Sequence, residues 1–225
     1  MKNRKVFARF FTDPASNITY RLNTVLQFGN CWNIIGSAIL LNPGSATISS
    51  ELPSSEELQH LNNITGTKNG WNIVDYSRDT TIRDSLPRIF NGYFANINRE
   101  LNGIILLYNL FNLKETDSKK AKSIQAHICS EYLYTSSSDI ELINNSPIVF
   151  LGWGKDLPSE LNTHAKHLFS QLNKDIISHY DSIFEKNTFY HPLAIQRGYK
   201  RWKLVQNNIA KFEEAIKKLR LSTSG

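Results

Sequence analysis

Apolar runs that each end at a polar or glycine residue set the pattern of this chain. Three long runs and one short run occupy residues 34–41, 104–111, 147–154 and 187–190. Continuous apolar character is typical of strands that are buried on both faces of a parallel sheet. Asn42-Pro43-Gly44 stops the first run, because proline lacks an N–H donor and glycine adopts backbone angles closed to other residues. The pattern predicts four parallel central strands.

Apolar positions between these runs recur at helical spacing. They predict helices over residues 79–97, 117–143, 161–184 and 202–221. Strands that alternate with helices indicate a parallel sheet whose two faces are covered by right-handed crossovers. The expected fold class is therefore α/β, a three-layer α/β/α arrangement around a four-stranded parallel sheet, with residues 1–225 forming a single domain.

Three further segments lie outside this alternating pattern. Residues 9–11 and 20–26 alternate in polarity around a turn at 13–17, which predicts an N-terminal hairpin at the edge of the sheet. Residues 48–78 are polar, and a long polar segment after a strand end is typical of an active-site cover. We interpret this segment as an insertion over the cleft, and residues 222–225 as a tail.

Charge and composition restrict the class of protein. The formal net charge is +6, and the positive residues gather toward the C-terminal end, which suggests a polyanionic partner. No apolar run approaches the roughly 18 residues that cross a bilayer, and no signal-peptide pattern is present. Two cysteines are too few for a disulfide scaffold. We expect a cytoplasmic monomer with no membrane association, no metal and no cofactor.

The residues at the strand ends are the candidate chemistry. Asn42, Asn109, Trp153 and His191 mark the four exits, and ligands of open α/β sheets bind beyond the carboxyl ends of strands. No serine or cysteine stands beside a base there, so no activated nucleophile is indicated. Two amides and an imidazole suit the orientation of a water, the reading of an amide edge and the stabilisation of an oxyanion. Departure of a nucleobase from its sugar requires these three tasks.

Four motifs at the strand ends resemble the uracil-DNA glycosylase superfamily, in the same order along the chain. They are Asn42-Pro43-Gly44, Leu106–Leu110, Val149–Gly154 and His191–Tyr199. The first has the Asn-Pro-Gly form of the mismatch-specific and thymine-DNA branch. A little-characterised bacterial and phage domain family on that fold is also similar, through Asn42–Thr47, Asp79–Arg83, Asn109–Phe111 and His191–Leu193.

The resemblance implies a metal-independent, monofunctional DNA glycosylase that acts on a flipped base in duplex or single-stranded DNA. Asn42 and His191 would be catalytic, the amide positioning a water and the imidazole stabilising charge on the base carbonyl. Asn109 would read the base edge, and Leu193 or Ile195 would wedge into the vacated base stack. Phosphate contacts would come from Arg197, Lys200, Arg201 and Lys203.

The resemblance also predicts the lining of a base pocket. Pro43 and Gly44 would contact the base, and the glycine stands where strict uracil enzymes carry an aromatic residue that blocks C5 of the pyrimidine. A pocket without that wall admits a larger base, although a turn alone also explains a glycine. Trp71 and Tyr76 are candidates to stack on the base or to pack in the core. Ser45, Asp79 and Arg83 could support the site, or serve as ordinary caps and surface residues.

Three functions remain open on the sequence alone. The first is a glycosylase, in repair or antiviral defence, that leaves an abasic site. Its base would be a C5-modified pyrimidine, such as a modified cytosine of phage DNA, or a uracil or mismatched thymine. The second is a non-catalytic nucleic-acid-binding relative, and the third is an enzyme that processes a nucleoside or nucleotide in the same crevice. The joint presence of Asn42, Asn109, His191 and the wedge loop favours the first.

Overall fold

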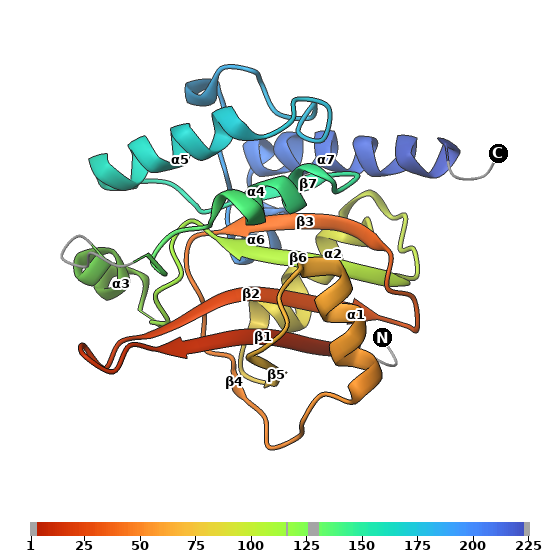
Figure 1. The fold of residues 1–225 in the computed structure, drawn as a ribbon. Helices are drawn as coiled ribbons and strands as arrows, with labels where there is room; N and C mark the ends of the chain where they lie inside the picture. Colours follow the sequence, from red (N-terminus) through yellow and green to blue (C-terminus); the bar gives the residue numbers. More distant parts are fainter. Residues whose placement is uncertain (1–3, 116, 126–130, 223–225) are drawn as a thin grey trace.

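The computed structural model describes residues 4–115, 117–125 and 131–222, which form a mixed α/β structure around one open sheet (Figure 1). Among these residues the sheet has seven strands in the order β4-β5-β1-β2-β6-β3-β7. The strands are β1 (Arg4–Thr12), β2 (Thr19–Phe28), β3 (Ile34–Leu40), β4 (Thr47–Ile48), β5 (Trp71–Asp75), β6 (Gly103–Asn109) and β7 (Val149–Gly152). The sheet is therefore mixed, and the prediction of a four-stranded parallel sheet is wrong.

Three of the four predicted parallel strands are confirmed. β3 pairs in parallel with β6 on one side and with β7 on the other, and Ile39 lies opposite Tyr108 and Leu151. Residues 187–190 form no strand; a single backbone hydrogen bond, from the Gly154 N–H to the Phe189 carbonyl (2.7 Å), links them to the residues that follow β7. The Phe189 ring packs into an aromatic cluster with Trp153 instead, so burial of this ring replaces strand pairing.

The N-terminal hairpin exists but does not lie at the edge of the sheet. β1 pairs antiparallel with β2 and with β5, and β2 also pairs antiparallel with β6. Val6, Phe7, Val25 and Leu26 are all buried, on both faces of the two strands. Because β5 pairs with the outer side of β1 and β6 with the outer side of β2, the hairpin lies inside the sheet, and its two faces are covered by other parts of the protein.

The segment 48–78 extends the sheet and does not cover the cleft. It contains β4, helix α1 (Ser55–Thr65) and β5, and β5 adds to the free side of β1. Ser54 forms a capping box with Glu57, and Gly66 ends α1 in the left-handed conformation at φ 67°. Local capping thus gives this polar segment a helix, and pairing with β1 gives it a strand.

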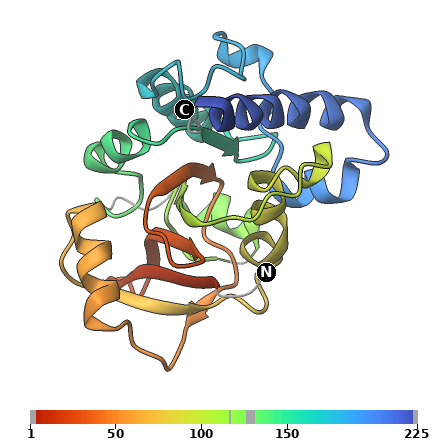
Figure 2. The same ribbon diagram turned by 90° about the vertical axis from the view of Figure 1, so that its right-hand side faces the viewer.

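Helices cover both faces of the sheet (Figure 2). One face packs against α1, α3 (Ser118–Gln125), α4 (Ser137–Asn144) and α5 (Ser159–Gln171). The other face packs against η1 (Thr81–Ser85), α2 (Leu86–Phe90), η2 (Tyr93–Ala95), α6 (Pro192–Gly198) and α7 (Lys203–Ser222). Figure 2 shows α1 on one side of the strands and α2 on the other. In the described part of the chain, no helix combines the length and apolar character that crossing a membrane requires.

Three predicted helices are shorter or more broken than expected. The helix predicted over 117–143 is divided into α3 and α4, and residues 131–136 between them are not helical. The helix predicted over 79–97 consists of the π-helical turn η1, the short α2 and the 3₁₀ turn η2. Pro87 lies at the start of α2, where its missing N–H is tolerated but interrupts a continuous helix. The helix predicted over 161–184 ends at Gln171, because Leu172 is extended. The prediction of a C-terminal helix is confirmed by α7, and residues 223–225 of the predicted tail lie outside the described residues.

His179 gives the fold a testable acid sensitivity. Its ring contacts Phe212 of α7, neither ring nitrogen has a hydrogen-bond partner among the described residues, and burial lowers its pKa from the usual 6.5 to about 3. The unfolded chain therefore binds a proton between pH 6.5 and 3 that the folded chain does not, so folding stability falls as pH falls through this range. In urea unfolding, we expect the free energy of unfolding of His179→Leu to rise relative to that of the wild-type protein as the pH is lowered from 6.5 to 3. A difference that stays constant from pH 8 to pH 3 would contradict this.

Candidate functional site

A cavity of about 470 Å³ opens at the carboxyl ends of β3 and β6. Its floor is formed by three buried polar side chains, those of Arg21, Asp79 and Asn109. Half-buried residues surround the mouth: Asn42, Ser45, His191 and Leu193. Leu40 and Leu107 face the α6–α7 side of the sheet, and two residues further along each chain Asn42 and Asn109 lie on that same side. The convergence of both asparagines and His191 in one cavity agrees with the expectation from the strand ends.

The Asn42 amide is held in one orientation. Its Nδ2 donates to the carbonyl of Glu115 (2.6 Å) and to that of Pro43 (3.0 Å). A carbonyl can only accept, so the NH₂ group must face these two oxygens. The Asn42 Oδ1 is then left as an acceptor at the mouth of the cavity, which is the group that orienting a water requires.

His191 is neutral and has a defined tautomer. Its pKa is lowered to about 4, mainly by burial, which outweighs the opposing charge of Asp79, and to a smaller extent by the charge of Arg197. Nδ1 accepts the Leu193 N–H (3.3 Å) in the N-cap of α6, so the neutral ring carries its proton on Nε2. Nε2–H makes no hydrogen bond to the described residues, and it can donate to an oxygen of a bound ligand.

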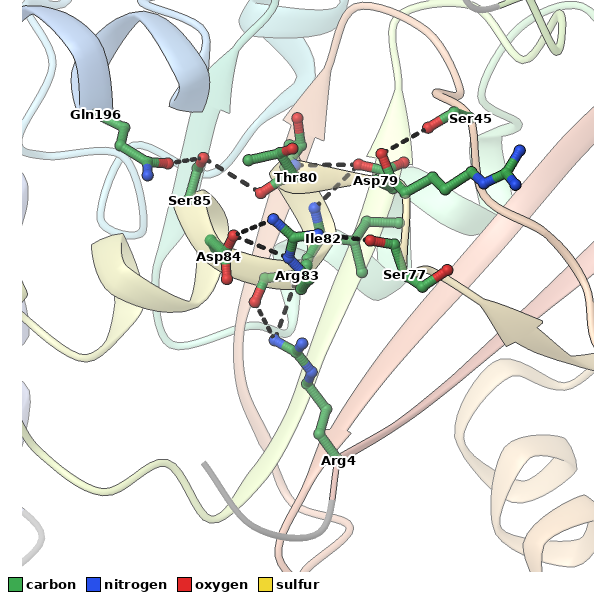
Figure 3. A network of polar contacts seen from close by, with 12 residues as sticks. Arg4, Ser45, Ser77, Asp79, Thr80, Ile82, Arg83, Asp84, Ser85 and Gln196 are labelled. Atoms are coloured by element: carbon green, nitrogen blue, oxygen red, sulfur yellow. Dashed lines mark hydrogen bonds and ion pairs between the residues drawn. The ribbon is translucent and has the colours of Figure 1, made fainter.

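Asp79 fills the space beside Gly44. A Cβ on Gly44 would lie 2.7 Å from Asp79 Oδ2, so only glycine allows this approach. Asp79 Oδ1 accepts the N–H groups of Thr81 and Ile82, both at 3.1 Å, at the start of η1 (Figure 3). The expectation that Gly44 leaves an open wall for a larger base is corrected: a buried carboxylate occupies the place of the missing side chain.

Arg21 is a floor residue that sequence reasoning missed. β2 contains a bulge, because the step from Ala8 to Phe10 on β1 matches three residues of β2, Thr24 to Arg21. A regular strand would place Arg21 on the same face as Val25, four residues away, which packs in the opposite cluster. The extra residue turns Arg21 toward Asp79 and the cavity. A lone arginine among buried strand positions was the available signal.

Two buried floor groups lack protein partners. The Nε and Nη1 atoms of Arg21 and the Nδ2 atom of Asn109 make no hydrogen bond within the described part of the chain. Burial lowers the pKa of Arg21, and the charge of Asp79 opposes that shift. Buried donors of this kind are costly unless something accepts from them, so the floor is suited to a ligand with hydrogen-bond acceptors.

Several predicted site residues lie elsewhere. Trp71 is buried beside α1 and donates to the Thr67 carbonyl (3.2 Å), and Tyr76 donates to the Arg4 carbonyl (3.3 Å). Neither lines the cavity, so the prediction that they stack on a base is wrong, and their alternative packing role holds. Pro43 is buried and contributes its carbonyl to Asn42, but its side chain does not line the cavity.

Hydrogen bonds and an ion pair within residues 77–85 stabilise the conformation of this segment. Arg83 donates to the Ser77 carbonyl (2.6 Å) and pairs with Asp84 (2.9 Å), and it does not line the cavity (Figure 3). Ser45 donates to the Arg78 carbonyl (3.2 Å) at the cavity wall. Of the expected supporting residues, Asp79 and Ser45 therefore lie at the site, and Arg83 stabilises the segment that carries Asp79.

The predicted wedge and phosphate contacts divide into two groups. Leu193 lines the cavity, whereas Ile195 is fully buried in the core and cannot act as a wedge. Arg197, Lys200, Arg201 and Lys203 are all exposed. Arg201 and Lys203 line a second hollow of about 700 Å³, which shares Gly154, Lys155 and His191 with the first. The two hollows therefore adjoin at His191, and the second has a basic rim beside the exposed ring of Trp202.

The described residues contain no group of three or more histidine, cysteine, aspartate or glutamate side chains that could hold a metal ion. Comparison of the chain with protein-family models, with curated proteins and with solved structures finds no match.

Gly44→Ala tests the contact between Gly44 and Asp79. The methyl group would lie within 2.7 Å of the carboxylate, and overpacking of this kind costs about 1–3 kcal/mol of unfolding free energy. We expect a loss of this size in urea unfolding, and a much smaller loss when the same change is made in an Asp79→Ala background. Equal losses in the two backgrounds would show that the carboxylate is not the obstacle.

Proposed function

We propose that the protein is a DNA glycosylase, with the three-layer arrangement of the uracil-DNA glycosylase type, that hydrolyses the N-glycosidic bond of a flipped pyrimidine. One observation carries the proposal: the free Asn42 acceptor and the His191 Nε2–H donor meet at the mouth of a cavity whose floor can read a base. A cavity of about 470 Å³ is within the range of ordinary small-molecule sites. Cleavage would leave an abasic site and needs neither metal nor cofactor.

The chemistry follows from charge development in the reaction. As the bond between C1′ and the base breaks, its electron pair passes to the base and the sugar becomes an oxocarbenium-like cation. His191 Nε2–H donates to the base carbonyl as negative charge gathers there, and it needs no net charge to do so. Asn42 Oδ1 orients the water that adds to C1′. An amide is a poor base, so stabilisation of the leaving group supplies most of the rate.

Asp79 adds a negative charge beside the reaction centre. Its Oδ1 is occupied by two N–H groups, while its Oδ2 makes no hydrogen bond to the described residues. The carboxylate stabilises a cationic sugar electrostatically and can accept the proton that the water loses. This role gives the Gly44–Asp79 contact a catalytic purpose, because glycine at position 44 lets the carboxylate approach the backbone just past the end of β3.

The second hollow supports DNA as the substrate. Extrusion of a nucleotide costs a few kcal/mol of stacking free energy, and Leu193 is placed at the mouth to occupy the vacated space. Arg201 and Lys203 beside Trp202 combine cationic groups with an exposed ring, as single-stranded nucleic-acid grooves do. We assign the flanking nucleotides to this hollow, and we propose a cytoplasmic role in repair or in defence against phage with modified bases.

A second candidate is an enzyme that processes a nucleoside or nucleotide. Arg21 favours this second candidate. Its buried guanidinium in the floor of the cavity could also bind the phosphate of a small nucleotide by donating hydrogen bonds to the phosphate oxygens. The basic rim and the exposed Trp202 of the adjoining hollow favour the longer DNA substrate.

Asn42→Ala tests the proposed chemistry. Duplexes that contain uracil, mismatched thymine or 5-substituted cytosine are incubated with the protein, and abasic sites are then cleaved with alkali. We expect scission by the wild-type protein and a loss of at least about 100-fold in Asn42→Ala, with DNA binding retained. Asn72→Ala is the control, because Asn72 also donates to a backbone carbonyl but lies away from the cavity. Absence of scission on every substrate, modified phage DNA included, would refute the glycosylase proposal.

Leu193→Ala separates base extrusion from chemistry. A wedge matters only where a base leaves a duplex stack, so kcat/KM should fall about tenfold or more on duplex DNA and little on single strands. Leu52→Ala, which changes an exposed leucine of the 48–78 segment, should leave both unchanged. Equal losses of Leu193→Ala on both substrates would assign Leu193 to the cavity wall alone.

A further inference from the structure

We propose that the floor of the cavity binds an oxyanion carried by the substrate, held by Arg21 together with the Asn109 amide. The inference rests on the proposed function in one respect, since it takes the floor as the end of the cavity that receives the base. It names a substrate class that the strand-end motifs do not indicate: a ligand with an acidic group at its buried end.

The guanidinium of Arg21 is buried and incompletely paired. Its side chain is 2% exposed, and two of its three guanidinium nitrogens are buried without a hydrogen-bond partner. Asp79 acts on it electrostatically, but no ion pair of Arg21 occurs among the described residues. A buried cation without a partner destabilises a protein, and its retention at a cavity wall is explained when a ligand supplies the missing acceptors.

Arg4 has a structural role in this fold and can be compared with Arg21. It lies on neighbouring strand β1, its Nη1 donates to the carbonyls of Ile82 (3.1 Å) and Arg83 (2.8 Å), and its guanidinium stacks on Tyr76 at 4.5 Å. Arg4 thus joins two segments of the protein. Arg21 makes no such connection, so a structural role does not account for it.

The Asn109 amide lines the same cavity as Arg21. Asn109 is 1% exposed, and its Nδ2 atom also lacks a partner among the described residues. The Arg21 guanidinium and the Asn109 NH₂ group thus both offer unpartnered donors at this floor, and charge-assisted hydrogen bonds from a guanidinium bind carboxylate and phosphate oxygens strongly. A neutral carbonyl would accept from these donors but would add no charge to the partial compensation of Arg21 by Asp79.

Basic residues outnumber acidic residues in the lining of the cavity. Its lining contains Arg21, Arg78, Lys122 and Lys155 against Asp79 and Glu115, and Glu115 pairs with Lys120 at 2.9 Å. Asp79 repels an anion, but its carboxylate faces Gly44 and the start of η1. The repulsion therefore directs an oxyanion away from the Gly44 wall and toward Arg21.

Two sources could carry this oxyanion, an acidic substituent on the base or the phosphate of a small nucleotide. Isothermal titration calorimetry distinguishes them in two arms. The first compares 5-carboxyuracil with 5-carbamoyluracil, which is nearly isosteric and neutral. The second compares deoxycytidine monophosphate with deoxycytidine, and includes inorganic phosphate. Preference for the carboxylate assigns the group to the base, and preference for the phosphate assigns it to a nucleotide; either supports an oxyanion site.

We expect the wild-type protein to bind the charged member of one pair at least about tenfold more tightly, as one charge-assisted hydrogen bond requires. Arg21→Met should abolish this discrimination. It should also unfold at an equal or higher temperature than the wild-type protein without ligand, because it removes a buried unpaired charge. Arg9→Met is the matched control: Arg9 is a half-buried arginine of β1 outside the cavity, and its loss should leave the discrimination intact.

Three results would overturn the proposal: no discrimination by the wild-type protein in either arm, full discrimination in Arg21→Met, or a loss in Arg9→Met equal to that in Arg21→Met. If Arg21→Met does not fold, Arg21→Gln takes its place under the same criteria. The titrations use free bases and nucleotides, so they do not depend on DNA cleavage. Failure of the glycosylase assay and failure of this inference are therefore separate results.

Discussion

The parallel pairing of β3 between β6 and β7 is the constraint on which the site depends. Leu40 lies opposite both Asn109 and Gly152, so the three strands end at one edge of the sheet. The Leu110 N–H donates to the Leu40 carbonyl (2.6 Å) and continues the pairing just past the end of β6. Because side chains alternate with a period of two, this register also decides that Asn42 and Asn109 face the same cavity.

This constraint explains which parts could be predicted from the sequence. Continuous apolar runs identify strands buried on both faces, and parallel strands bring their carboxyl ends together, so Asn42, Asn109 and His191 were accessible to sequence reasoning. The order of the whole sheet was not. β5 reaches the free side of β1 only through a long-range pairing, and no local pattern in the polar segment 48–78 specifies that partner.

The residues that were misjudged depend on tertiary contacts. Arg21 faces the cavity because β2 has one residue more than β1 requires, and a bulge of this kind is defined by both strands together. The sequence shows only that Gly44 lacks a side chain. In the structure, Asp79, 35 positions later in the chain, fills the space that a side chain at position 44 would occupy. Sequence shows that a side chain is missing; it does not show what replaces it.

The composition of the site argues for a ligand more strongly than for stability. Its floor combines a buried arginine, a buried aspartate and an unpartnered amide, and its mouth holds a histidine that burial keeps neutral. The unpartnered donors of Arg21 and Asn109 raise the free energy of the folded state, and the apolar clusters on the two faces of the sheet must offset them. Apolar side chains of similar volume would serve folding better at these two positions. Local violations of packing rules are expected where a protein acts, and here two of them share one cavity at the ends of β3 and β6.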